Sequence, residues 1–277
     1  MPWFPDFANA MVLARAQTRA VGQADPVRQY FSALNSGDSR DLETVWPGEV
    51  VVYDPRLGEI RGHKQLRQFI RTSQNWLAER HARTETMAVT TANGRAVVEL
   101  LAHLSIDGRD VAWPVAVVAE SRDDRSVAFR TYGSLLPVQG QRSVRPVILA
   151  LPPPSAAAPV RAGDVVGRYF AAVEAGDVEA AVRTFEADGY IRDPAGPQAI
   201  HRGAAELRSF FAAQFSAGGI GLQQCAETDD GVRCAVEYNC VRWGTRDLPP
   251  QPGLGVYERA ADGLLAAARS YDDIEPP

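Results

Sequence analysis

Apolar residues recur at helical spacing near the start of each half of the chain. Positions i, i+3, i+4 and i+7 are filled twice, by Val27, Tyr30, Phe31 and Leu34 and by Val166, Tyr169, Phe170 and Val173. Asp25 and Pro26 suit the N-cap and first turn of the first helix, and Gly37 and Gly176 suit the left-handed residue that ends each helix. The pattern predicts an amphipathic helix in each half, followed by a second, shorter helix.

Longer apolar and alternating runs follow, and they predict strands. In the first half the runs cover residues 49–54, 84–91, 95–106, 111–119 and 126–132, with turn signals at Asn93-Gly94 and Asp107-Gly108. A third helix is expected after a turn and Arg61-Gly62, and again after Arg202-Gly203. Three helices followed by an antiparallel meander predict an α+β fold, in which a curved sheet wraps around the helices and encloses a pocket.

The two halves are repeats of one unit. At a constant offset, residues 29–38 align with 168–177, 54–55 with 193–194 and 130–132 with 269–271. A proline- and alanine-rich stretch lies between them. We therefore expect domain 1 at residues 1–143, a linker at 144–163 and domain 2 at 164–277. Phe7, Met11 and Leu13 indicate an extra helix at the N-terminus of domain 1.

Composition narrows the class of partner. Hydrophobic residues make up 45% of the chain and charged residues 23%, and the net charge of −5 provides no positive field for a nucleic-acid backbone. No apolar run reaches the length of a membrane span and the N-terminus lacks a secretory signal pattern, so we expect a cytoplasmic protein. The cysteines and histidines show no metal-ligand spacing, and no cofactor motif is present, so neither metal nor cofactor is expected.

An ordered set of landmarks occurs twice: an aromatic helix, Gly-Asp, a strand ending in Asp-Pro, Arg-Gly and an apolar helix. This order resembles ketosteroid isomerase and the SnoaL-like proteins of the nuclear-transport-factor-2-like superfamily. The resemblance implies two tandem cone-shaped units, each with about three helices packed on a curved, mainly antiparallel sheet. The superfamily includes isomerases, cyclases, epoxide hydrolases and proteins without catalytic activity, so the fold alone does not identify the reaction.

The resemblance also implies site residues. Asp54 and Asp193 correspond to the catalytic base that precedes proline, and Tyr30 and Tyr169 correspond to the phenol that stabilises an enolate. The protonated acid that completes the ketosteroid isomerase site has no counterpart. Alternatively, each aspartate only bonds the amides of its own turn, and each tyrosine is a core residue.

Glu99 and Glu237 lie in the middle of predicted strands, and the same alignment directs them into the pockets, with His103 on the face of Glu99 and Asn239 on the face of Glu237. Two carboxyls that face one apolar cavity predict paired acid and base catalysis. Alternatively, a register shift of one residue turns either glutamate to solvent, or a structural ion pair with a neighbouring arginine holds it.

Four more side chains are expected at the pockets. Trp113 and Tyr257 are candidate pocket-lining residues, and Tyr271 and Asp272 are a candidate rim in the second unit only, because Gly133 stands at the position of Asp272.

The sequence favours a cofactor-independent acid/base enzyme for a small hydrophobic molecule, of the isomerase, cyclase or epoxide hydrolase type found in secondary metabolism. The alternative is a non-catalytic ligand-binding or assembly module, and a third possibility is one active and one degenerate unit. The two units are expected to pack as an intramolecular pseudo-dimer.

Overall fold

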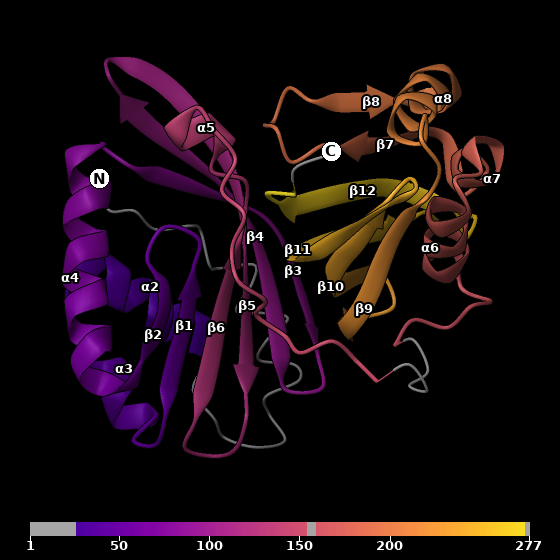
Figure 1. Cartoon of the computed structure of the whole chain (residues 1–277). Helices are drawn as coiled ribbons and strands as arrows, with labels where there is room; N and C mark the ends of the chain where they lie inside the picture. The colour runs from indigo at the N-terminus through magenta and orange to yellow at the C-terminus, as the bar shows by residue number, and fades with distance from the viewer. Residues whose placement is uncertain (1–25, 154–158, 275–277) are drawn as a thin grey trace. The chain divides into compact units, whose positions relative to one another are not determined.

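The computed structural model describes residues 26–153 and 159–274 (Figure 1). The chain forms two units that divide between Tyr132 and Gly133. The expected N-terminal helix lies outside the described residues. Within them, no helix has the length and apolar character needed to cross a membrane.

The first unit has helices on one side of a six-stranded sheet. Its elements are α2 (Pro26–Ser36), α3 (Arg40–Val45), β1 (Val50–Asp54), β2 (Gly58–Arg61), α4 (Gly62–Glu79), β3 (Arg83–Ala92), β4 (Arg95–Ile106), β5 (Arg109–Ser121) and β6 (Val127–Tyr132). The strand order is β2-β1-β6-β5-β4-β3. Only β1 and β6 pair in parallel, and the other neighbours are antiparallel.

The second unit repeats this arrangement. Its elements are α5 (Leu136–Gln139), α6 (Val165–Ala175), α7 (Val178–Val182), β7 (Phe185–Arg192), β8 (Ile200–Arg202), α8 (Gly203–Gln214), β9 (Ile220–Asp229), β10 (Arg233–Trp243), β11 (Arg246–Arg259) and β12 (Leu265–Asp272). The strand order is β8-β7-β12-β11-β10-β9, again with one parallel pair, β12 and β7. Figure 1 shows α6, α7 and α8 together on one side of this sheet. The predicted tandem α+β fold is confirmed.

Local sequence signals place the ends of these elements. Gly37 and Gly176 adopt positive φ values of 71° and 69° directly after α2 and α6. Asn93 and Asp107, both at a φ of 50°, start the tight turns that join β3, β4 and β5. The prediction missed β2 and β8: the segments expected as turns before Arg61-Gly62 and Arg202-Gly203 fold back as short antiparallel strands on β1 and β7.

Residues 133–143, expected in domain 1, pack with the second unit. Asp273 lies just after β12 and accepts hydrogen bonds from Oγ of Ser134 at 2.6 Å, from N of Leu135 at 3.2 Å and from N of Ser143 at 2.6 Å. Nη1 of Arg142 donates to the carbonyl of Ile274 at 2.8 Å. These bonds hold the segment, which we call the strap, beside the end of β12.

Candidate active site

The register of each sheet decides which side chains face the helices. In the first unit Leu100 pairs with Val115 and both line a cavity between helices and sheet, whereas Glu99 pairs with Ala116 on the opposite face. In the second unit Tyr238 lines the corresponding cavity, so its neighbour Glu237 lies on the outer face.

The expectation that Glu99 and Glu237 face the pockets is therefore wrong. Each is flanked by apolar residues on both sides in the strand, so the alternation of the sequence does not identify the inner face. Asn239 shares the outer face with Glu237, and its Nδ2 donates to the carbonyl of Leu149 at 3.0 Å. His103 lines a separate open cleft of the first unit rather than the inner cavity.

The two expected tyrosines of the second sheet also lie outside its cavity. Tyr271 pairs with Leu254 on the outer face, where the guanidinium of Arg192 lies 4.6 Å from the centre of its ring. Tyr257 is on the inner face but is part of the core, with its ring centre 5.2 Å from that of Tyr169.

In the first unit, Tyr30, Asp54 and Trp113 line one inner chamber of about 60 Å³. The ring of Tyr30 stacks on Phe129 at 4.3 Å between centres. Burial, and then the charge of Asp54, raise the pKa of Tyr30 far above its usual value, while a hydrogen bond with the side chain of Thr131 opposes this rise. Tyr30 is therefore a neutral phenol at every physiological pH.

Asp54 is held by its own turn and by a cation. Its Oδ1 accepts from the backbone N of Arg56 at 2.9 Å and of Leu57 at 3.0 Å. Nε of Arg56 lies 3.6 Å from the same oxygen, and its guanidinium lies 4.1 Å from the centre of the Trp76 ring. Asp54 thus both lines the chamber and bonds its turn amides, and Arg56 compensates its charge.

The second unit encloses a larger chamber of about 130 Å³. Its apolar walls come mainly from α8 and β9, with Phe210, Phe211, Phe215, Ile220 and Leu222. Three expected residues line it: Tyr169, Asp193 and Asp272. Asp193 is half-buried, and its Oδ1 accepts from N of Ala195 at 2.8 Å.

Asp272 is the buried acid of this chamber. Register places Tyr238 on β10, Gly253 on β11 and Asp272 on β12 side by side. Because Gly253 has no side chain, the phenol of Tyr238 crosses β11 and donates to Oδ2 of Asp272 at 2.8 Å.

The electrostatic environment keeps Asp272 partly protonated near neutrality. Burial raises its pKa to about 6, and the charge of Asp193 adds a smaller rise. The hydrogen bonds from Tyr238 and from N of Ile274, and the charge of Arg142, oppose the rise. Burial and Asp272 in turn raise the pKa of Tyr169, which stays a neutral phenol.

Sequence reasoning missed Tyr238 and Arg142, which also line this chamber. The signal for Tyr238 was the isolated Gly253 on the next strand, because glycine within a strand often marks a close approach. No sequence signal indicated Arg142, because the strap is not part of the repeat and its basic residues are typical of a solvated linker.

The two chambers differ in chemistry. Where the second unit has Tyr238, Gly253 and Asp272, the aligned positions of the first have Leu100, Val115 and Gly133. The first chamber therefore contains one compensated carboxylate, and the second contains a pair. Across residues 26–153 and 159–274, no three His, Cys, Asp or Glu residues gather as a metal site.

A model of the SnoaL-like domain matches the chain twice, at residues 27–129 and 166–268. The first range begins in α2 and ends in β6, and the second begins in α6 and ends in β12. No curated protein matches the chain.

Solved structures similar to this chain include three that each cover about two fifths of it. A candidate polyketide cyclase from Sinorhizobium meliloti is 23% identical over 38% of this chain and 92% of its own, with a TM-score of 0.33. The epoxide hydrolase/cyclase-like enzyme SalBIII, which has a role in pyran ring formation in the polyether salinomycin, is 24% identical over 39% and 87%, with a TM-score of 0.34. A Catenulispora acidiphila protein with a ketosteroid isomerase-like fold, in complex with trimethylamine, is 17% identical over 40% and 87%, with a TM-score of 0.35.

Proposed function

The chain belongs to the SnoaL-like domain family, which its two halves match separately, and we propose that its second unit is a cofactor-independent acid/base enzyme. The observation that carries the proposal is the buried Asp272, with a pKa of about 6, in the same apolar chamber as Asp193. Two carboxyls with different environments can divide the roles of acid and base.

Asp272 suits the general acid, because burial keeps a proton on it at a pH where exposed carboxyls are ionised. Asp193 suits the base, because it is half-buried and its Oδ1 already accepts an amide hydrogen bond. In epoxide opening, Asp193 takes a proton from water or from a substrate hydroxyl, and the oxygen of that water or hydroxyl attacks an epoxide carbon. Asp272 gives its proton to the departing epoxide oxygen.

The same pair can move a proton next to a carbonyl. Asp193 then removes a proton from the carbon, and Asp272 protonates or hydrogen-bonds the enolate oxygen. Both reactions need a small, mainly apolar substrate with one oxygen function, and they correspond to the hydrolase or cyclase type and to the isomerase type. The chamber of about 130 Å³ is below the roughly 300–1,000 Å³ of drug-sized sites.

The first unit supports a second candidate function, the binding of a ligand without chemistry. Arg56 compensates the charge of Asp54, and Gly133 stands where the second unit has Asp272. One catalytic and one binding unit is therefore the division that we favour.

The test is a screen of small epoxides and β,γ-unsaturated ketones against the wild type, Asp193→Asn, Asp272→Asn and the matched variant Asp54→Asn. We expect turnover that Asp193→Asn and Asp272→Asn each lower by about 10²-fold or more, and that Asp54→Asn leaves unchanged. The rate should fall as pH rises through about 6, because Asp272 loses its proton. Turnover that survives both second-unit variants would refute the assignment.

A further inference from the structure

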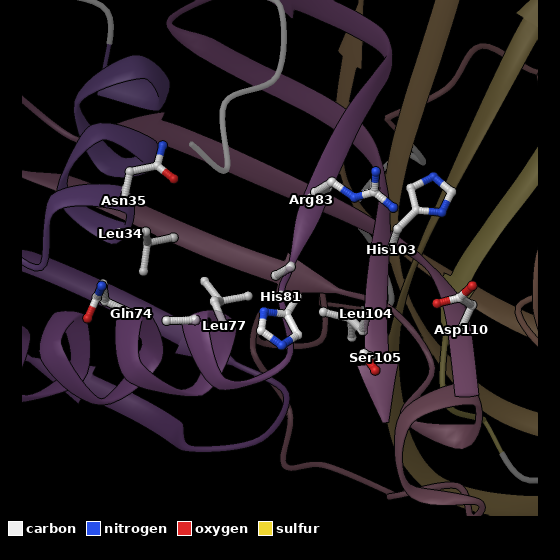
Figure 2. Close-up of a pocket in the computed structure, with 12 residues that line it drawn as sticks. Leu34, Asn35, Gln74, Leu77, His81, Arg83, His103, Leu104, Ser105 and Asp110 are labelled. Carbon is white, nitrogen blue, oxygen red and sulfur yellow. The ribbon is translucent and has the colours of Figure 1, made fainter. Parts of the chain in front are cut away.

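The first unit has a second cavity, an open cleft of about 620 Å³. Leu34 and Asn35 of α2 and Leu77 of α4 line its helical side, and Arg83, His103 and Asp110 line its strand side (Figure 2). The cleft is polar on the strand side, in contrast to the inner chamber of the first unit, which Tyr30 and Trp113 line.

The cleft and the chamber share a boundary. Leu34 and Leu77 line both cavities, so these two side chains separate the polar cleft from the space beside Trp113. An elongated molecule that passes between them has a polar environment at one end and an apolar one at the other.

Asn35 provides the specific polar feature. Both its Nδ2 and its Oδ1 are buried, and neither has a hydrogen-bond partner among residues 26–153 and 159–274. Buried polar groups are nearly always paired in folded proteins, so an amide that lacks both bonds calls for an explanation. A primary carboxamide or a protonated carboxyl presents one donor beside one acceptor, and this geometry satisfies both atoms of Asn35 at once.

We propose that the cleft and the chamber form one binding site for an amphipathic molecule with a carboxamide or carboxyl head group. The head group pairs with Asn35, and the apolar tail passes Leu34 and Leu77 toward Trp113. This site is independent of the acid/base pair of the second unit.

Calorimetric titration of the full chain with octanamide tests the proposal. We expect binding that Asn35→Ala weakens about tenfold, since two hydrogen bonds are lost. Butanamide should bind more weakly by about fourfold for each methylene that leaves the apolar path. Leu77→Trp, which fills the boundary, should also weaken octanamide binding, whereas Gln68→Ala on the exposed face of α4 and Asp272→Asn in the other unit should not.

A second measurement separates binding from folding. Asn35→Ala removes two buried atoms that have no partner in the described part of the chain and adds a better helix former, so its melting temperature should equal or exceed that of the wild type. Octanoic acid distinguishes the head groups: only its protonated form presents a donor beside an acceptor, so its affinity should fall as pH rises and the carboxyl ionises, whereas the affinity for octanamide should stay unchanged. The proposal is overturned if octanamide does not bind, or if Asn35→Ala and Leu77→Trp both leave its affinity unchanged.

Discussion

Tyr238 and Asp272 meet across β11, where a side chain at Gly253 would separate them. A Cβ atom at Gly253 would lie 2.5 Å from Cε2 of Tyr238 and 2.9 Å from Cβ of Asp272. The hydrogen bond between the two side chains therefore requires that residue 253 has no side chain. This hydrogen bond positions Asp272, the acid of the proposed site.

The pH dependence of stability should report Asp272. Its pKa in the folded protein, about 6, exceeds the value near 4 of an unfolded chain, so its contribution favours folding below pH 4 and is lost as pH rises through 6. Over this range the free energy of unfolding should fall by about 2–3 kcal/mol from this group. Urea denaturation between pH 4 and 8 should show that Asp272→Asn removes the fall and that Asp188→Asn, at an exposed position, keeps it. An unchanged slope in Asp272→Asn would contradict the burial argument.

Gly253→Ala should break the contact between Tyr238 and Asp272. The added methyl overlaps the ring, so we expect a loss of about 1–3 kcal/mol in stability. The pKa of Asp272 should rise further, because the Tyr238 hydrogen bond lowers it. Carbon-13 NMR titration of the carboxyl groups measures the shift. Tyr238→Phe should also raise the pKa of Asp272, but without the steric overlap. If the pKa of Asp272 moves in opposite directions in the two variants, Gly253 does not act through the Tyr238 hydrogen bond.

Asp273 should protect the strap from proteolysis. Asp273→Asn weakens three hydrogen bonds that hold residues 133–143, which we expect to cost about 1–3 kcal/mol of local stability. Trypsin should then cleave after Arg142 about tenfold faster or more, as followed by mass spectrometry. Equal cleavage of the wild type, Asp273→Asn and the exposed control Asp188→Asn would mean that other contacts hold the strap.

Arg56→Gln should destabilise the first unit, because it leaves Asp54 buried beside its turn without a cation. The expected loss is about 2–4 kcal/mol. Asp54→Asn in the same background should recover part of it, and Arg71→Gln on the exposed face of α4 should cost little. A double-mutant cycle by urea denaturation measures the coupling, and additive effects would show that the two side chains act independently.

Part of the second chamber was predictable from the repeat. Asp193 and Tyr169 line the second chamber. They could be predicted because a strand-ending Asp-Pro and an aromatic helix position are local features present in both copies. Asp272 was expected at a rim, and the structure places it deeper, where burial raises its pKa. Tyr238 and Arg142 depend on neighbours that are distant in sequence.

The duplicated unit, the helices and the hairpin turns follow from local sequence signals, because caps, glycines and the hydrophobic period act over a few residues. Which carboxyls share a chamber depends instead on strand pairing and on packing between distant parts of the chain. Glu99 and Leu100 are adjacent in a strand that is apolar around both, so only pairing with β5 and packing against the helices select the inner side chain. The strap reaches its place through hydrogen bonds to Asp273, which lies 130 residues from Ser143 along the chain.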